Sequence, residues 1–121
     1  MKLPHAGAAA ACVLGLALAT SPATPAARAA EPAFDCGKVE ADSIAGMVCT
    51  DDGLAALDRK MAAVYAEATA KATGAQRSGL KAEQRGWIKG RDDCWKSDDK
   101  RAWVEQAYVL RIAELQAAYA L

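Results

Sequence analysis

Residues 50–65, TDDGLAALDRKMAAVY, open the segment that decides the fold. Thr50 is a favourable N-cap residue, and the two aspartates after it suit the positive end of a helix dipole. Apolar residues then recur at spacings of 3, 4, 3 and 4, the repeat of one helix face. Because a glycine ahead of a polar turn is a typical helix end, the helix should stop near Gly74. Its predicted apolar face consists of Leu54, Leu57, Met61, Val64 and Ala68.

A second helix is predicted from about Ser78, over residues 80–95, LKAEQRGWIKGRDDCW. Two of its glycines, Gly86 and Gly90, each cost about 1 kcal/mol of helix propensity relative to alanine. In a sequence that otherwise favours a helix, they indicate close approach to a neighbouring segment. The stripe on one side of this helix consists of Leu80, Gln84, Trp87, Ile88, Arg91 and Trp95.

The first two helices are separated by only a few residues, so they should be antiparallel neighbours. Residues whose numbers sum to about 151 should then face each other. This register places Asp58 near Arg91 and Cys94, and Tyr65 near Trp87. We expect Asp58 and Arg91 to form a buried ion pair that fixes the register, with a ligand-binding arginine as the alternative. Trp87 is expected in the core.

A third helix is predicted after residues 95–100, WKSDDK, which interrupt the second apolar stripe. Ser97 can cap it, with Asp98 and Asp99 in its first turn. A bent or nearly continuous path from the second helix to the third is an open alternative. The third apolar stripe consists of Val104, Tyr108, Ile112, Leu115 and Tyr119.

The predicted fold class is therefore all-α: an antiparallel helical hairpin plus a C-terminal helix, in a three-helix arrangement. No segment alternates apolar and polar residues as a half-buried strand does. One further short helix is expected within residues 37–47.

Residues 1–29 have the pattern of a secretory signal peptide, with cleavage expected after Ala29. Lys2 precedes an apolar stretch at residues 8–19, which is shorter than the about 20 residues that a membrane span needs. Cys12 lies inside that stretch, so we expect it to be removed with the signal; a lipid anchor is the alternative. Residues 30–121 should form one secreted or periplasmic domain without stable membrane insertion.

The charge balance makes nucleic acid an improbable partner. Without Lys2 and Arg28, the 15 basic residues of the chain become 13 against 15 carboxylates, so the mature chain has a net charge of −2. Proteins that bind nucleic acid usually carry a basic surplus on one face.

The residue types argue against most enzyme chemistry. The one histidine, His5, lies in the predicted signal, so the mature chain cannot form Ser-His-Asp or Cys-His catalytic groups. It has no Cys-x-x-Cys zinc motif, and residues 51–53 lack the alternating oxygen ligands of a calcium loop. We predict no catalytic residue, metal or cofactor. Paired carboxylates could in principle hydrolyse glycosides, but a small helical domain rarely forms the cleft that this reaction needs.

One spacing in the second helix is specific enough to indicate a family. With residues 107–116, AYVLRIAELQ, after it, the mature chain resembles the LprI lysozyme inhibitor family of small secreted bacterial proteins. The resemblance implies a helical, disulfide-bonded, non-enzymatic protein whose partner is a lysozyme, and it assigns no inhibitory residue. The motif consists of Gln84, Arg85, Trp87, Arg91, Asp92 and Cys94.

The family pattern has four cysteines in two bridges, but this chain has Trp103 where the fourth would lie. The resemblance implies that Cys36 pairs with Cys49, in a loop of about 14 residues whose closure contributes roughly 3 kcal/mol. Export to an oxidising compartment agrees with a bridge. Cys94 is then expected as a buried free thiol, with an intermolecular disulfide or a reactive thiol as the alternative.

The loop between the second and third helices is the candidate partner-binding surface. It joins two tryptophans with four carboxylates, and aromatic anchors among charges are common in protein-binding hot spots. Alternatively, the tryptophans pack on the end of the hairpin, and the aspartates serve as helix-end charges or a solvated face. We expect a lysozyme inhibitor; the alternative is a structural or stress-related envelope protein with another partner. The candidate residues are Asp92, Asp93, Trp95, Asp98, Asp99 and Trp103.

Overall fold

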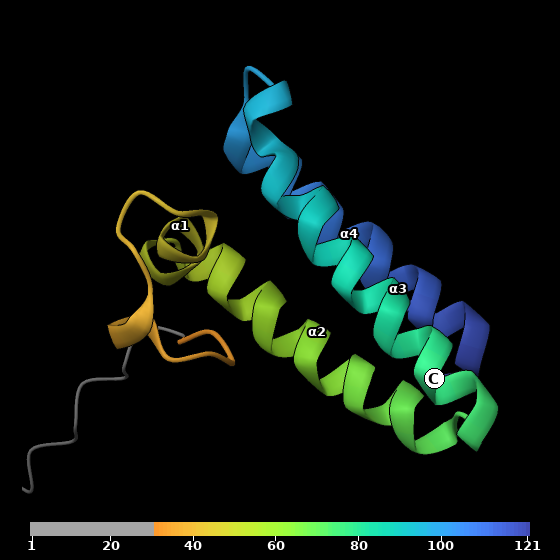
Figure 1. The fold of residues 1–121 in the computed structure, drawn as a ribbon. Coiled ribbons are helices and arrows are strands. Elements are labelled where there is room, and N and C mark those ends of the chain that lie inside the picture. The colour runs from red at the N-terminus through yellow and green to blue at the C-terminus, as the bar shows by residue number, and fades with distance from the viewer. Residues whose placement is uncertain (1–30) are drawn as a thin grey trace, which may run out of the picture.

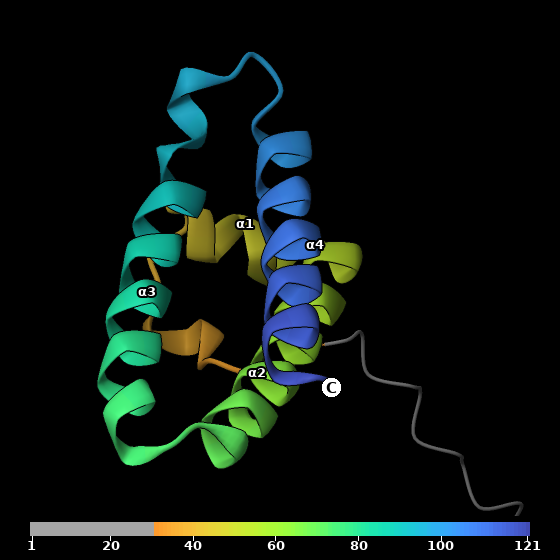
Figure 2. The ribbon, with the colours of Figure 1, turned by 90° about the vertical axis from the view of Figure 1, so that its right-hand side faces the viewer.

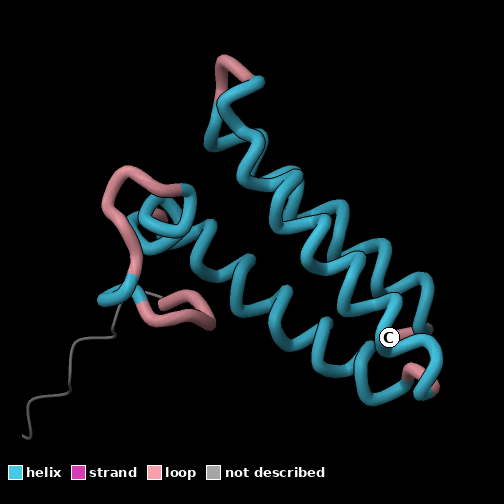
Figure 3. The backbone as a smooth tube through the Cα atoms, viewed as in Figure 1, coloured by secondary structure: helices cyan, strands magenta, loops and turns pink. Residues whose placement is uncertain are grey.

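The computed structural model describes residues 31–121, and every regular element within them is helical, as predicted. The predicted signal peptide lies outside the described residues. Figure 3 shows helices joined by short loops along this part of the chain. The elements are η1 (Cys36–Lys38), α1 (Ile44–Thr50), α2 (Asp52–Lys71), α3 (Gly74–Asp92), η2 (Asp93–Lys96) and α4 (Lys100–Tyr119).

The N-terminal segment is fastened to the helices by the predicted Cys36–Cys49 disulfide, which joins η1 to α1 with its Cα atoms 5.9 Å apart. Gly46, in α1, has no room for a side chain, because a Cβ there would lie 2.5 Å from the carbonyl oxygens of Glu40 and Ala41. The disulfide and this close contact hold the loop before α1 against the start of the helix.

The α2 helix begins one residue later than predicted, and its N-cap is Asp51 rather than Thr50. Thr50 ends α1, and its hydroxyl donates a hydrogen bond to the Gly46 carbonyl at 3.2 Å. Asp51 is the N-cap, since its Oδ1 accepts a hydrogen bond from the Leu54 N–H at 3.0 Å. Both residue types can cap a helix, and Thr50 is already used by the short helix that precedes it.

The boundary between α2 and α3 was also predicted wrongly. Thr73 caps α3 in a capping box: its hydroxyl accepts from the Gln76 N–H, and the Gln76 side chain accepts from the Thr73 N–H at 2.8 Å. Gly74 is therefore the first residue of α3 rather than the end of α2, and the helix starts before the expected Ser78. The Thr-x-x-Gln spacing was the signal for this cap.

The third helix begins at Lys100 and is capped by Asp99, whose Oδ1 accepts from the Ala102 N–H at 2.9 Å. The predicted cap, Ser97, instead donates a hydrogen bond to the Asp99 carbonyl at 3.2 Å. The continuous path from second to third helix is not adopted. The chain reverses at η2, so that α3 and α4 lie side by side as an antiparallel hairpin (Figure 2).

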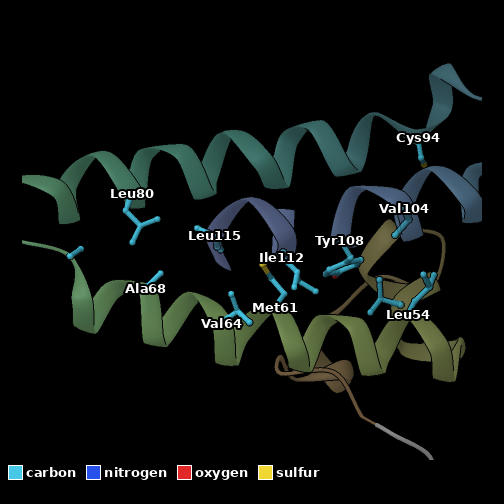
Figure 4. Packing of buried hydrophobic residues seen from close by; sticks show 12 residues of the cluster. Leu54, Met61, Val64, Ala68, Leu80, Cys94, Val104, Tyr108, Ile112 and Leu115 are labelled. Carbon is cyan, nitrogen blue, oxygen red and sulfur yellow. The ribbon is translucent and has the colours of Figure 1, made fainter. Parts of the chain in front are cut away.

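The core lies where α4 packs against both other long helices, most extensively against α2. The α2 and α3 helices are antiparallel neighbours at their short connection, as predicted, but they diverge from it, so few of their residues meet directly and α4 packs against both of them (Figure 1). Figure 4 shows the apolar side chains of the three helices pointing toward one another. The large side chains with less than 2% exposure are Val48, Leu54, Leu80, Val104, Tyr108 and Leu115.

The prediction that a neighbouring segment approaches α3 closely at Gly86 and Gly90 is wrong for the described residues. A Cβ at either position would meet no atom within 4 Å, so both glycines face open space. No packing contact of α3 within the described residues 31–121 requires a glycine there.

Candidate functional site

The hairpin tip, residues 92–103, projects beyond α1 and α2 at the end of the α3–α4 pair (Figures 1 and 2). It contains all six residues that the sequence indicated as a binding surface. The structure therefore brings these residues to one projecting end of the molecule.

The two tryptophans of the hairpin tip have different surroundings. Trp95 is 69% exposed, and the Lys96 ammonium lies 5.2 Å from the centre of its ring. Trp103 is 36% exposed, and its indole N–H donates a hydrogen bond to the Gly90 carbonyl at 3.0 Å. Trp103 is therefore fixed against α3, whereas Trp95 presents most of its apolar surface to solvent.

Two of the four aspartates at the hairpin tip are ion-paired with neighbours. Asp92 Oδ1 lies 2.8 Å from the Arg91 guanidinium, and Asp93 Oδ2 lies 2.9 Å from the Lys96 ammonium. The hydrogen bond from Lys96 is the main cause that lowers the pKa of Asp93 below its ordinary value. Both charges are thus largely balanced locally.

The other two aspartates also divide into a structural and an exposed group. Asp99 is the N-cap of α4, which uses one of its oxygens, while Asp98 is exposed at the turn. The hairpin tip is therefore less acidic toward a partner than four aspartates suggest. The most exposed apolar side chain of the tip is Trp95.

Beneath the hairpin tip, a buried hydrogen-bond network links all three long helices. Within residues 31–121, Asp58 and Arg91 form no direct ion pair, which corrects the prediction. The Tyr108 hydroxyl lies between them: it donates to Asp58 Oδ1 at 2.8 Å and accepts from Arg91 Nη1 at 2.9 Å. Asp58 Oδ2 also accepts from the Ala33 N–H at 2.8 Å, which ties the N-terminal segment to α2.

Burial raises the pKa of the Tyr108 hydroxyl well above its ordinary value, and the hydrogen bond to Asp58 adds to the shift while the charge of Arg91 opposes it. The tyrosine therefore stays neutral and bridges the two charges as donor and acceptor. Sequence reasoning placed Tyr108 only on an apolar stripe and missed this role. The signal available was its hydroxyl, since a buried tyrosine usually finds a hydrogen-bond partner.

The residues of the family motif, in α3 and η2, mainly contact α4 or lie buried beside it. The Trp87 indole N–H donates to the Ala107 carbonyl at 3.0 Å, and its ring packs edge-on against Tyr108 with centroids 5.1 Å apart. Gln84 Oε1 accepts a hydrogen bond from the buried Arg111 at 3.2 Å. Of the other motif residues, Arg85 is exposed, Arg91 and Cys94 are buried, and Asp92 pairs with Arg91.

Cys94 is a buried thiol in η2, with 2% of its surface exposed. A thiol with so little exposure is poorly placed to react with another chain, since disulfide exchange requires access to the sulfur. The structure therefore favours the buried thiol over the intermolecular disulfide.

A groove of about 450 Å³ lies where α2 and α3 diverge. Tyr65 and Trp87 line it, as do Asp58 and Arg91. The charged groups of Asp58 and Arg91 are already hydrogen-bonded within the chain, so the groove presents a mainly apolar surface. The larger apolar residues in its walls include Phe34, Met61 and Ile88.

Within residues 31–121, no group of three or more His, Cys, Asp and Glu side chains is arranged to hold a metal ion. No helix in this same part of the chain combines the length and the hydropathy that a membrane span requires.

Comparison with known proteins places the chain in a family. The family model "Lysozyme inhibitor LprI" matches residues 36–120. The chain is similar to lipoprotein LprI of Mycobacterium bovis and to that of two Mycobacterium tuberculosis strains, at 33% identity over 108 residues. That alignment covers 89% of this chain and 53% of each relative, so the chain spans about half the length of these curated relatives. No solved structure matches the chain significantly. The chain belongs to the LprI lysozyme inhibitor family.

Proposed function

We propose that the exported chain, residues 30–121, is a non-enzymatic protein that binds a lysozyme and inhibits it by blocking the cleft in which the enzyme holds its glycan. Membership of the family and the name of its model support the lysozyme as target. Export directed by residues 1–29, followed by their removal, would release the domain into the periplasm or the cell exterior, where a lysozyme acts.

The observation that carries the proposal is the exposure of Trp95 at a projecting hairpin tip. A convex tip with an aromatic side chain fits a concave cleft, and buried aromatic anchors supply much of the energy of protein interfaces. Trp103 and the paired aspartates form the rim of the same surface. The buried Asp58–Tyr108–Arg91 network holds the base of the tip and so preorganises it for binding.

The test is the clearing of a peptidoglycan suspension by lysozyme, followed by turbidity with and without the purified mature chain. We expect the chain to slow clearing in proportion to its concentration. Trp95→Ala combined with Trp103→Ala should lose at least about 2 kcal/mol of binding free energy. Circular dichroism of the double variant should match that of the parent.

Ile88→Ala is the matched control, because Ile88 is a 40% exposed apolar residue of α3 that lies outside the hairpin tip. Unchanged inhibition by the folded double tryptophan variant would place the contact elsewhere. If the parent neither binds nor inhibits lysozyme, the lysozyme proposal is wrong, and an envelope protein with another partner becomes the better explanation.

A further inference from the structure

The α3 helix carries a row of cations on a side that no other helix covers. Only two of its 19 residues, Leu80 and Arg91, are buried, because α4 is the only long helix that packs extensively against it (Figure 2). On its exposed surface, basic residues recur at every fourth position, the spacing of neighbours along one ridge of a helix. We name them the α3 basic row: Arg77, Lys81, Arg85 and Lys89.

The α3 basic row is not neutralised by the rest of the described chain. Within residues 31–121, none of its four side chains forms an ion pair, and its one polar side-chain contact is a hydrogen bond from Arg77 Nε to the Thr69 carbonyl at 3.1 Å. The whole of α3 has five cations against two carboxylates, a net charge of +3. Both carboxylates pair with arginines outside the row. The row therefore faces solvent as four uncompensated positive charges.

Charges on α4 follow the opposite pattern. There Arg101 pairs with Glu105, and Arg111 with Glu114, so that charges about one turn apart have opposite signs. The α3 basic row instead places like charges about one turn apart three times, which destabilises a helix. A helix that keeps this repulsion without an internal anion is suited to an external one.

The ridge beside the row leaves the cations accessible from one side. Each cation has a small, exposed residue three positions before it, and residues three apart are neighbours on a helix surface. A Cβ at the first or the last of these small residues would meet no atom within 4 Å. A linear ligand can therefore lie against α3 and reach all four cations. The small residues are Gly74, Ser78, Ala82 and Gly86.

The spacing of the cations fits a polymer of phosphodiesters. Successive members of the row lie about 6 Å apart along the helix axis, and the row spans about 18 Å. As many bonds separate successive phosphates of a glycerol phosphate chain as two residues of a peptide contain, and two extended residues reach about 7 Å. One phosphate can thus face each cation. Arginine binds phosphate through paired hydrogen bonds, and lysine binds it as a point charge.

We propose that the α3 basic row binds a linear polymer of phosphodiester repeats, of which poly(glycerol phosphate) is the simplest. Four residues exceed one helical turn, so the row winds by about 120° around α3 from its first cation to its last. A flexible polymer can follow this winding, whereas a flat bilayer cannot face all four cations. A helix on a membrane surface also buries large apolar side chains, and Ile88, 40% exposed, is the one such side chain on the exposed surface of α3.

Nucleic acid has phosphates at a similar spacing, but its bases need a different surface. Single strands are held largely by stacking of their bases on aromatic side chains. The aromatic residue of α3, Trp87, is instead packed edge-on against Tyr108. A polymer without bases therefore fits α3 better. The row also lies outside residues 92–103, so this binding does not depend on the proposed lysozyme contact.

The first test is calorimetric titration of purified residues 30–121 with poly(glycerol phosphate), without lysozyme. We expect the logarithm of the binding constant to fall against the logarithm of the salt concentration with a slope of about −3, since four phosphate contacts release counterions. Lys81→Ala combined with Arg85→Ala should weaken binding at least about tenfold at low salt and should about halve this slope. The matched control is Arg59→Ala with Lys60→Ala, which removes the same charge from exposed positions of α2 and should weaken binding much less.

Urea unfolding separates binding from a role of the row in the fold. The variant with both Lys81→Ala and Arg85→Ala should be at least as stable as the parent, because it loses like-charge repulsion. Lower stability of this variant would mean that the row serves the fold, and it would overturn the proposal. So would a parent that does not bind the polymer, or a double variant that binds it as tightly as the parent.

Two other ligands test the nature of the occupant. Phosphatidylglycerol vesicles present the same glycerol phosphate group on a flat bilayer, and a single-stranded oligonucleotide carries bases on its phosphodiester chain. We expect both to bind more weakly than poly(glycerol phosphate) at equal phosphate concentration. Tighter binding to either ligand would assign the row to a membrane or to nucleic acid, and the polymer would be the wrong occupant.

Discussion

At the scale of residues, Tyr108 joins the three long helices through one hydroxyl group. It lies on α4, donates to Asp58 of α2 and accepts from Arg91 of α3. Its ring also packs against Trp87, and the Arg91 guanidinium lies 5.8 Å from the centre of the ring. The ring of Tyr108 therefore fills the core, while its hydroxyl forms hydrogen bonds with two charged groups whose burial without a partner would cost free energy.

We predict that Tyr108→Phe destabilises the protein by about 1 to 3 kcal/mol, although it keeps the aromatic ring. The loss arises because Asp58 and Arg91 would each remain buried with one hydrogen bond fewer. Urea unfolding followed by circular dichroism measures the difference. Tyr119→Phe, at the edge of the core, is the control and should cost less. Equal stability of parent and Tyr108→Phe would mean that water replaces the hydroxyl without penalty.

At the scale of elements, Asp51 serves two helices at once. One of its oxygens caps α2 through the Leu54 N–H, and the carboxylate pairs with Arg101 of α4, whose Nε lies 2.7 Å from Oδ2. The hydrogen bond from Arg101 is the largest cause that lowers the pKa of Asp51 below its ordinary value of 3.8, and the Leu54 N–H is the second. The start of α4 is thereby tied to the start of α2.

We predict that this arrangement contributes stability that is lost in acid. Because the folded-state pKa of Asp51 is lowered, its contribution is present above pH 3.8 and disappears as the pH falls through the folded-state pKa. Asp51→Asn keeps a good N-cap but cannot ionise, so its unfolding free energy should fall less steeply below about pH 4. Urea unfolding at a series of pH values measures this slope, with Asp52→Asn as the neighbouring control. Parallel pH curves for parent and Asp51→Asn would contradict the prediction.

The helices themselves were predictable from sequence, because α2 and α4 have clear apolar repeats; the stripe of α3 was mixed, and its Ile88 and Trp95 are exposed. Their ends were not, since Thr50, Asp51, Ser97 and Asp99 are all good caps and only the surrounding structure decides between them. The packing of the helices was harder to predict: the short connection suggested that α2 and α3 pack along their length, but the buried side chains of α4, Val104, Tyr108, Ile112 and Leu115, pack against both helices.

The candidate site was also predictable from the sequence only in part. Sequence alone indicated residues 92–103 as a surface with tryptophans and charges, and the structure brings them to one tip. It could not indicate that Lys96 and Arg91 pair with the aspartates beside them, because this depends on the turn geometry of η2. Nor could it show that a tyrosine bridges Asp58 and Arg91, since helix periodicity gives only the side of a helix on which each residue lies.

At the scale of the whole molecule, the hairpin of α3 and α4 has two separate exposed surfaces. The hairpin tip exposes Trp95, and a second surface along α4 exposes Val109 and Leu110, while the opposite side of α4 is buried against α2. In the proposed function, the first surface binds lysozyme. Leu110→Ala should therefore leave lysozyme inhibition unchanged in the turbidity assay, because Leu110 lies outside the hairpin tip.

The charge distribution of the whole molecule leads to a final prediction, on the rate of association with a basic lysozyme. Residues 30–121 have a net charge of only −2, and Asp92 and Asp93 are paired at the tip. Electrostatic steering should be weak, so raising salt should slow association only modestly. Lys96→Ala should leave Asp93 unbalanced beside Trp95, which makes the tip more acidic. This variant should associate faster at low salt and show a steeper dependence on salt, as stopped-flow fluorescence of the tryptophans can measure. A steep salt dependence for the parent, equal to that of Lys96→Ala, would show that the aspartates act as free charges despite their pairing.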